Sequence, residues 1–399
     1  MKKIFFLIAL FFAFDLSAQS LKTGFWRAVL QTQAQELPFM VEVVHANKVL
    51  IINGKEQFAC EQIRYDQDSV HIDLGHFDGE LVAKISDQKM QGYWVRFNTS
   101  QPYQVPFFME FGKKNRFESL KKAETDFSGT WEVEFVSDQG VAKKVVGIFE
   151  QKNEYLTGTF LTPTGDYRFL EGKTEAKSMA MSSFNGGDAY LFQADLQTDN
   201  SIKGQYWSGK SYHATWTARR NEQAKLPDAN TMTFLKEGYK TLDFAFPNLE
   251  GKTIQLTDEK FKNKVVIVQL FGSWCPNCMD ETAFLAPFYK KNKSKGLEIV
   301  ALAYENYDNL AQAKPRIEKI VKRFEVGYEI LFAGKKDKEV ANKTLPALNA
   351  ILSFPTTIVI DKKGLVRQIH TGFSGAATGK YYLAWIEEFE SLISKLLKE

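Results

Sequence analysis

Short runs in which apolar and polar positions alternate fill most of the first half of the chain. Val, Ile, Phe and Tyr recur at about every second position, in runs such as MVEVV, SVHIDL and KVVGIFEQ. Turn segments that carry Gly, Asn or Asp separate these runs, as in NGK, DGE and TGD. A period of two with turns at this spacing is typical of antiparallel sheet. We therefore predict antiparallel β structure, as a meander or a small barrel.

Two segments of this region resemble each other. Each opens with a glycine, one further residue and a tryptophan, and each ends near a Tyr-Trp pair that follows a glycine. The marks are GFW from residue 24, GYW from residue 92, GTW from residue 129 and GQYW from residue 204. We predict two N-terminal β domains, residues 20–119 and 120–222, and the second is a candidate repeat of the first.

The pattern changes after a polar stretch at residues 223–241, which we interpret as a linker. From Leu242 onward, apolar runs alternate with segments whose apolar residues recur at helical spacing. The predicted strands are KVVIVQLFG, LEIVALAY, YEILFAG, FPTTIVID and LVRQIHTGF, and the predicted helices are MDETAFLAPFYKKNK, NLAQAKPRIEKIVKRF, KEVANKTLPALNAI and YYLAWIEEFESLISKLLK. Parallel strands joined by helices place helices on both faces of a sheet, so residues 242–399 are predicted to form an α/β domain.

The first residues carry the pattern of an export signal. Lys2 and Lys3 precede an apolar run at residues 4–14. That run is shorter than the roughly 20 residues that cross a bilayer. We therefore predict a cleaved signal peptide over residues 1–18, ending at Ala18, and a periplasmic or secreted protein without a membrane span.

Composition limits the classes of partner. A chain of 399 residues is longer than a domain with a single hydrophobic core usually is, so we expect two or three domains. An apolar content of 44% with 25% charged residues is typical of globular proteins. A net charge of +3 is too small to indicate a nucleic-acid partner.

The chain has three cysteines, too few for the disulfide framework of a small exported domain. Cys60 lies far from the other two. We predict that it is a buried, unpaired thiol, and an exposed reactive thiol is the alternative. Cys275 and Cys278 form a Cys-Pro-Asn-Cys motif that could be a redox centre, part of a metal site or a structural bridge.

A resident metal fits this motif poorly. A structural zinc needs about four ligands, and the five histidines are scattered along the chain. A covalent haem needs histidine directly after the second cysteine, where Met279 stands. We predict no cofactor and no metal, and transient binding of a soft ion such as Cu(I) remains chemically open.

A redox role explains the motif better. A cysteine between a buried strand and a helix start places its sulfur near free backbone N–H groups and the positive end of the helix dipole, which favours the thiolate. Cys275 is then the nucleophile, and Cys278, one turn on and more buried, resolves the mixed disulfide. Pro276 suits the first helical turn, and Trp274 is expected to pack beside the sulfur.

The run VVIVQLFGSWCPNC together with FPTTIVIDKKG resembles the thioredoxin superfamily, and in detail the TlpA-like exported thiol–disulfide oxidoreductases of bacteria. The lead-in LDFAFPNLEGKTIQLTDEKFKNKVV resembles the extra N-terminal β-hairpin of that family. The resemblance covers about residues 242–399, and it implies a thioredoxin fold there.

The same resemblance implies roles for residues outside the motif. Pro355 matches the cis-proline that faces the cysteines, with an ordinary trans proline as the alternative, and Phe354 before it offers backbone contacts to substrate. Glu281 matches a buried acid that takes the proton of the second thiol; a solvent-facing glutamate is the alternative. Gln269 replaces the buried aspartate of classical thioredoxins and cannot titrate. His370 is expected to be structural.

These observations predict an exported thiol–disulfide oxidoreductase that reduces protein disulfides. The catalytic residues are Cys275, Cys278 and Glu281, and the substrate contacts are Trp274, Pro276, Phe354 and Pro355. The expected partners are disulfide-containing clients, such as apocytochrome thiols or the cysteine pair of a metal site, and a membrane-bound donor of reductant.

Three alternatives stay open. The pair could work as an oxidant or isomerase, because Pro-Asn between the cysteines does not set the potential. The β domains could bind a ligand or surface partner, with an accessory redox domain. A peroxidase is the third, although the residues before Cys275 lack the Pro-x-x-x-Thr-x-x-Cys approach of peroxiredoxins.

Overall fold

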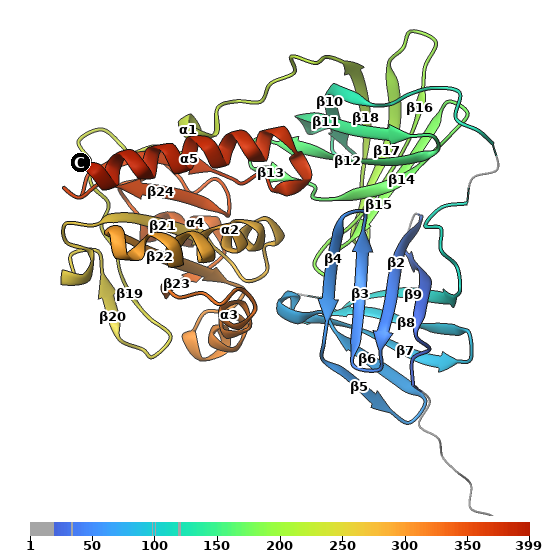
Figure 1. Cartoon of the computed structure of the whole chain (residues 1–399), viewed down its shortest axis with the longest axis horizontal. Coiled ribbons are helices and arrows are strands. Elements are labelled where there is room, and N and C mark those ends of the chain that lie inside the picture. Colours follow the sequence, from blue (N-terminus) through green and yellow to red (C-terminus); the bar gives the residue numbers. More distant parts are fainter. Residues whose placement is uncertain (1–19, 33–34, 98, 100, 119–120) are drawn as a thin grey trace, which may run out of the picture.

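The computed structural model describes residues 20–32, 35–97, 99, 101–118 and 121–399. The predicted signal peptide, residues 1–18, lies outside the described residues. Within the described part, no helix is long and apolar enough to cross a membrane. The chain folds into two antiparallel β-barrels and an α/β domain that lies beside them, as Figure 1 shows. The predicted fold class is confirmed.

The first barrel winds up and down in the order β4-β3-β2-β1-β9-β8-β7-β6-β5. Its strands are β1 (Gly24–Gln31), β2 (Glu36–His45), β3 (Lys48–Asn53), β4 (Glu56–Cys60), β5 (Ile63–Asp66), β6 (Ser69–Asp73), β7 (Gly79–Ser86), β8 (Lys89–Arg96) and β9 (Tyr103–Phe111), with a 3-10 turn η1 (Gly75–Phe77). Among the described residues, no ladder joins β4 to β5, so the barrel is nearly closed.

The second barrel follows the order β11-β10-β18-β17-β16-β15-β14-β12-β13, and pairing of β11 with β12 closes it. Its strands are β10 (Gly129–Ser137), β11 (Ala142–Lys152), β12 (Tyr155–Thr162), β13 (Gly165–Asp166), β14 (Leu170–Glu175), β15 (Ser178–Phe184), β16 (Ala189–Leu196), β17 (Ile202–Ser208) and β18 (Tyr212–Arg220). Alternation builds its core: in β10, Trp131, Val133 and Phe135 are buried, whereas Glu132 and Glu134 are exposed.

The two barrels share details of strand pairing and of local geometry at their openings. The first strand of each barrel pairs with its second and its last strand. The indole N–H of Trp26 donates to the Lys22 carbonyl at 2.9 Å, and that of Trp131 donates to the Phe127 carbonyl at 2.9 Å. The glycine two residues before each tryptophan has a positive φ, 128° at Gly24 and 117° at Gly129. A side chain is disfavoured at such a φ, which explains why both openings begin with glycine.

The α/β domain has a five-stranded sheet in the order β23-β22-β21-β24-β25 within residues 265–371, all of which the structure describes. β21 (Val265–Phe271), β22 (Leu297–Glu305) and β23 (Glu329–Lys335) are parallel, whereas β24 (Thr356–Ile360) and β25 (Val366–Thr371) form an antiparallel hairpin. The helices are α1 (Ala229–Met232), α2 (Pro276–Asn292), α3 (Leu310–Phe324), α4 (Lys338–Thr344) and α5 (Lys380–Lys398). A separate hairpin pairs β19 (Ala245–Pro247) with β20 (Thr253–Gln255). The 3-10 turns of this domain are η2 (Glu259–Phe261), η3 (Lys293–Lys295) and η4 (Ala376–Thr378).

Both faces of this sheet are covered. Residues of α2, α3 and α5 pack on one face, and α4 with the β19–β20 hairpin packs on the other. This burial explains why β21 and β22 are almost wholly apolar. The helix α4 is shorter than the predicted run, because Pro346 disfavours the helical conformation of Leu345 before it.

The predicted linker packs partly on the α/β domain. The Thr233 N–H donates to Thr371 Oγ1 at 3.1 Å, and Leu235 forms a β-bridge with Leu348. The first barrel also contacts this domain, because Arg316 of α3 pairs with Asp78 at 3.0 Å. The α/β domain therefore makes polar contacts both with the segment that precedes it and with the first barrel.

Candidate redox site

The two cysteines lie where a buried strand ends and a helix begins. β21 ends at Phe271 and α2 starts at Pro276, so Cys275 is the N-cap residue. Cys275 and Cys278 form a disulfide, and the Cys278 N–H donates to Cys275 Sγ at 3.1 Å. The sulfur therefore faces a backbone donor at the positive end of the helix, an arrangement that favours a thiolate once the pair is reduced.

The two sulfurs differ in their access to solvent. Cys275 is 4% exposed and Cys278 is fully buried. Pro276 occupies the first helical position, where its missing N–H leaves no helical hydrogen bond unmade. The placement of Pro276 and the deeper burial of Cys278 agree with the sequence-based expectation.

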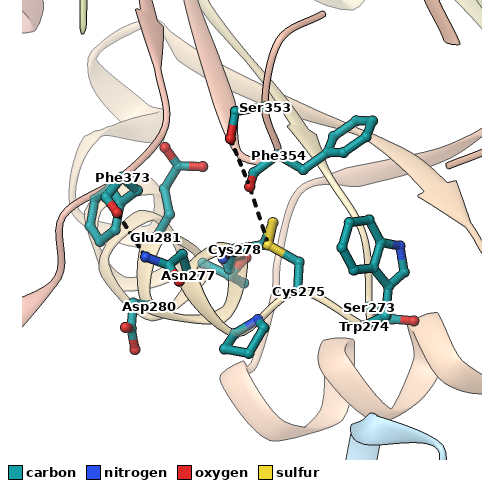
Figure 2. The surroundings of a disulfide bond; sticks show 12 residues. Ser273, Trp274, Cys275, Asn277, Cys278, Asp280, Glu281, Ser353, Phe354 and Phe373 are labelled. Atoms are coloured by element: carbon teal, nitrogen blue, oxygen red, sulfur yellow. Dashed lines mark hydrogen bonds between the residues drawn. A yellow bond between two sulfur atoms is a disulfide. The ribbon is translucent and has the colours of Figure 1, made fainter. Parts of the chain in front are cut away.

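A loop before β24 faces the cysteines from the opposite side (Figure 2). The Phe354–Pro355 peptide bond is cis, as the resemblance implied. The Phe354 carbonyl oxygen lies 3.5 Å from Cys275 Sγ. The Phe354 ring meets the Trp274 ring edge to face, with centroids 5.8 Å apart, and the Trp274 indole donates to the Tyr304 carbonyl at 2.9 Å. These contacts place backbone and aromatic groups beside the first sulfur.

Glu281 is fully buried one helical turn after Cys278. Its Oε2 accepts from Gln269 Nε2 at 2.8 Å, and its Oε1 accepts from Thr357 Oγ1 at 2.5 Å. Burial raises the pKa of Glu281 to about 7, against the opposing effect of the two hydrogen bonds. Gln269 stands at the position of the buried aspartate of classical thioredoxins. It does not titrate, but it donates a hydrogen bond to Glu281, which does.

Comparison with known proteins agrees with this geometry. The Redoxin family model matches residues 229–381. The thiol-disulfide oxidoreductase ResA of Geobacillus thermodenitrificans is 31% identical over 142 residues, which cover 35% of this chain and 72% of ResA. The chain belongs to the ResA-type, TlpA-like thiol-disulfide oxidoreductases. ResA of Bacillus subtilis is 30% identical over 138 residues, which cover 35% of this chain and 69% of that protein.

Among solved structures, the chain is similar to a thiol:disulfide interchange protein of the thioredoxin family from Chlorobium tepidum. It is 22% identical, with a TM-score of 0.30, and the match covers 41% of this chain and 98% of that protein. In this ResA-type chain, the Cys275–Cys278 pair is the CxxC disulfide, and the substrates of such an oxidoreductase are disulfides of client proteins.

The second barrel reaches the ResA-type site through the β12–β13 hairpin. Asn277, between the two cysteines, donates through Nδ2 to the Asp166 carbonyl at 3.3 Å and to the Phe373 carbonyl at 3.0 Å. Asp166 Oδ2 accepts from the Gly375 N–H at 2.5 Å, and burial together with the charge of Asp280 raises the pKa of Asp166 to about 7. The barrel is thus bonded to the CxxC motif itself.

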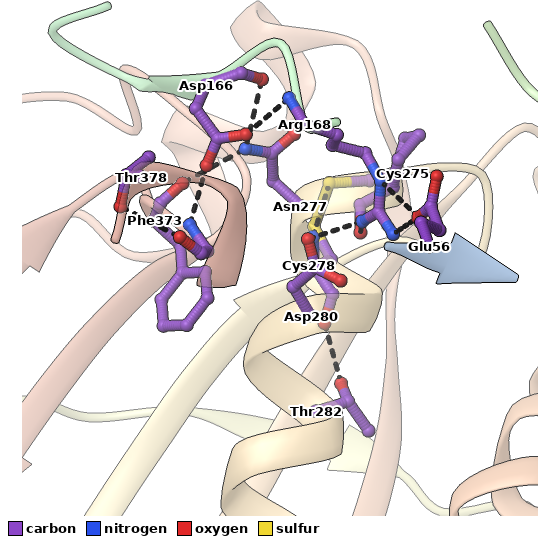
Figure 3. A network of polar contacts seen from close by, with 12 residues as sticks. Glu56, Asp166, Arg168, Cys275, Asn277, Cys278, Asp280, Thr282, Phe373 and Thr378 are labelled. Atoms are coloured by element: carbon purple, nitrogen blue, oxygen red, sulfur yellow. Dashed lines mark hydrogen bonds and ion pairs between the residues drawn. A yellow bond between two sulfur atoms is a disulfide. The ribbon is translucent and has the colours of Figure 1, made fainter. Parts of the chain in front are cut away.

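A second residue of the same hairpin region, Arg168, also contacts the motif. Its Nη1 donates to the Pro276 carbonyl at 2.9 Å, and it pairs with Asp280 and with Glu56 of the first barrel. Figure 3 shows these groups gathered beside the disulfide. All three domains therefore meet at the start of α2.

Glu305, at the end of β22, holds the segment before Cys275. Its carboxylate accepts from the Ser273 N–H at 2.9 Å and from Ser273 Oγ at 2.7 Å. Burial raises the pKa of Glu305 to about 7. Glu281 and Glu305 thus place one buried carboxyl beside each end of the CxxC segment, in addition to Asp166 from the second barrel.

The remaining candidates lie apart from this chemistry. His370 Nδ1 lies 3.0 Å from Asn230 Oδ1, and burial lowers the pKa of His370 to about 4. Cys60 is buried and unpaired, as predicted, and burial raises the pKa of its thiol to about 12. Within the described residues, no group of three or more His, Cys, Asp or Glu side chains is arranged to hold a metal ion.

Sequence reasoning missed four residues of the site: Asp166 and Arg168 from the second barrel, Glu305 from β22 and Asp280 from α2 itself. A glutamate that ends an apolar strand run was a usable signal for Glu305, because it follows LEIVALAY directly. Asp166 and Arg168 looked like ordinary turn residues in TGDYR. Nothing in their local pattern connects them with the cysteines.

Proposed function

We propose that the protein is an exported reductase of protein disulfides, with Cys275 as the nucleophile and Cys278 as the resolving thiol. The observation that carries this proposal is the buried Glu281 carboxyl, which follows Cys278 by one turn and has a pKa of about 7. A group with that pKa can accept and return a proton near neutral pH, which the resolving step requires.

In the proposed cycle, the Cys275 thiolate attacks one sulfur of a client disulfide. A mixed disulfide forms, and the other client cysteine leaves as a thiolate that takes a proton from solvent. Glu281 accepts the proton of the Cys278 thiol, and the new thiolate attacks Cys275 Sγ. The second client sulfur leaves and takes the proton from Glu281. Two electrons pass to the client, and the Cys275–Cys278 disulfide remains.

The oxidised pair then needs two electrons and two protons from a donor dithiol. An oxidising compartment does not supply these, so the proposal includes a membrane-bound protein that carries reductant outward. Export itself is supported by Lys2, Lys3 and the apolar run at residues 4–14. Clients such as apocytochrome thiols or a metal-site cysteine pair fit this chemistry.

Client binding is proposed for the surface formed by Trp274, Pro276, Phe354 and Pro355. The Phe354 carbonyl lies near Cys275 Sγ, so a client segment that pairs with this backbone brings its disulfide to the nucleophile. The second barrel borders this surface, because Ser353 Oγ donates to the Thr164 carbonyl at 3.2 Å. This border supports a role of the barrels in limiting which clients approach.

The redox potential tests the direction of the reaction. We expect a potential more negative than about −200 mV for the Cys275–Cys278 pair, because a reductase must have a dithiol that gives up electrons readily. The measurement is equilibration with glutathione buffers, followed by quantification of the two redox forms. A value more positive than about −150 mV contradicts the reductase direction and favours the oxidant alternative.

Phe354 is expected to restrict the clients. Phe354→Val removes the ring that packs on Trp274 and Tyr304, so we expect kcat/KM for a bulky protein disulfide to rise roughly tenfold, with little change for a small aromatic disulfide. The comparison of the two substrates is the measurement. Phe246→Val, which removes a partly buried ring of β19 away from the cysteines, is the matched control for lost packing. Equal changes for both substrates contradict the role in selection.

A further inference from the structure

Arg168 belongs to the second barrel but is bonded to the redox motif of another domain. Its side chain is 13% exposed. One guanidinium nitrogen donates to the Pro276 carbonyl at 2.9 Å, and the same nitrogen pairs with the Asp280 carboxylate. The guanidinium of Arg168 therefore contacts the backbone of the residue that directly follows the nucleophile, Cys275.

The backbone around Arg168 fixes the direction of this side chain. Arg168 has φ of 56°, a left-handed conformation that non-glycine residues seldom adopt and that costs about 1 kcal/mol or more. Its N–H donates to Asp166 Oδ1 at 2.5 Å, and the other oxygen of Asp166 accepts from Gly375 of the redox domain. Such conformations persist where the surroundings hold them, and here both domains do so.

The charges around Arg168 determine what its removal does to a thiolate. Arg168 pairs with two carboxylates, Asp280 at the motif and Glu56 at the start of β4 (Figure 3). With the cation present, one negative charge of this group is balanced. Without it, Arg323 still offsets part of the charge of the two carboxylates, but the start of α2 carries one more negative charge, and a negative charge on Cys275 becomes less favourable.

We propose that Arg168 is a positioning residue of the redox pair, which holds the Pro276 carbonyl and the Asp280 carboxylate in place and whose cation stabilises the Cys275 thiolate. The proposal rests on Cys275 being the nucleophile. The second barrel then contributes to the redox site, because its Arg168 influences the redox potential of the Cys275–Cys278 pair.

Replacing Arg168 with glutamine tests the charge. We expect the Cys275 thiol pKa of R168Q to rise by about one unit, because the thiolate loses a nearby cation. A less stable thiolate favours the disulfide, so at about pH 8 the equilibrium with glutathione shifts up to tenfold toward the oxidised pair, or about 30 mV more negative. The thiolate absorbance during a pH titration and the glutathione equilibrium are the two measurements.

Two further variants separate charge from structure. R168K keeps the cation, and its thiol pKa and potential are expected to stay closer to those of the wild type than to those of R168Q. Asp280→Asn removes a carboxylate instead, so its thiol pKa is expected to fall and its potential to become less negative. A merely structural role of this junction predicts the same sign for R168Q and D280N.

The matched control is Arg316→Gln, which breaks the ion pair with Asp78 between the first barrel and α3. R316Q is expected to lose interdomain contact but to keep the wild-type thiol pKa and potential. The inference is overturned if R168Q keeps the wild-type pKa and potential, or if R316Q shifts them equally. If Cys275→Ser retained disulfide reduction, the proposed function would fail instead, so the two failures are distinguishable.

Discussion

Replacing Cys275 with serine is expected to abolish disulfide reduction. The hydroxyl of serine does not ionise near neutral pH and cannot form a disulfide, so neither the mixed disulfide nor the Cys275–Cys278 bond can form. We expect a loss of at least about 1,000-fold in the turnover of a protein disulfide, which a reductase assay with a dithiol donor measures.

Cys278→Ser is expected to behave differently. Its Cys275 thiolate still attacks clients, but the resolving thiol is missing, so client proteins accumulate as mixed disulfides. Gel mobility with and without reductant detects these adducts, and mass spectrometry identifies the clients. Adducts in C275S, or none in C278S, contradict the assignment of nucleophile and resolving residue.

Cys60→Ala is the matched control for both variants. The Cys60 thiol is buried, and its pKa is raised to about 12, so it contributes almost no thiolate at neutral pH. We expect C60A to keep the wild-type turnover and to form no adducts in the presence of Cys278. A loss of activity in C60A comparable to that in C275S contradicts the two-cysteine mechanism.

Glu281→Gln is expected to slow the resolving step by about 100-fold, because glutamine cannot accept the proton of the Cys278 thiol. The variant retains the shape of the side chain: the amide oxygen can accept from Gln269 Nε2, and the amide NH2 can donate to the Thr357 hydroxyl, so the effect reports the proton. In the wild type, the step rate is expected to change with an apparent pKa near 7, and this transition disappears in E281Q. Rapid-mixing measurement of mixed-disulfide decay against pH tests both expectations.

The same substitution is expected to stabilise the fold. The pKa of Glu281 is raised from 4.5 to about 7 in the folded chain, so between these values the folded state holds a proton that the unfolded state releases. The free energy of unfolding of the wild type therefore falls as pH rises through this window. The free energy of unfolding of E281Q does not fall in this window, because glutamine does not titrate. At pH 8 it is expected to exceed that of the wild type by up to about 3 kcal/mol.

Glu305→Gln is the matched control, since Glu305 is also buried with a pKa raised to about 7. Denaturant unfolding of both variants across pH 4–8 is expected to show similar gains in stability. Only E281Q is expected to lose the pH-dependent resolving step. Equal kinetic losses in the two variants contradict a proton-transfer role for Glu281.

Some features of the site were predictable because their causes are local. The apolar run at residues 264–272, the Cys-x-x-C spacing and Pro276 together specify a strand end, an N-cap and a helix start, and the structure has each of them. The helical period also placed Glu281 on the face of Cys278, and burial of that face is confirmed. The two β domains were predictable for the same reason, since a period of two is visible within each strand.

Other features depend on contacts between distant segments. Arg168 and Pro276 are 108 residues apart in the chain, and no alternation or helical period relates them. The pKa of Glu281 also depends on more than its own helix, because Thr357 comes from β24 and Gln269 from β21. Likewise, closure of the second barrel rests on the β11–β12 ladder, which a strand pattern does not specify.

The amino-acid sequence by itself determined a CxxC pair at a helix start and two antiparallel β domains before it, and the resemblance to TlpA-like proteins implied the cis-proline loop opposite the pair. Only the tertiary structure decided that the second barrel is bonded to the redox motif through Asp166 and Arg168. The physical reason is the range of the interactions. Backbone periodicity and helix capping act within a few residues, whereas charge pairing and desolvation depend on which distant segments the fold brings together.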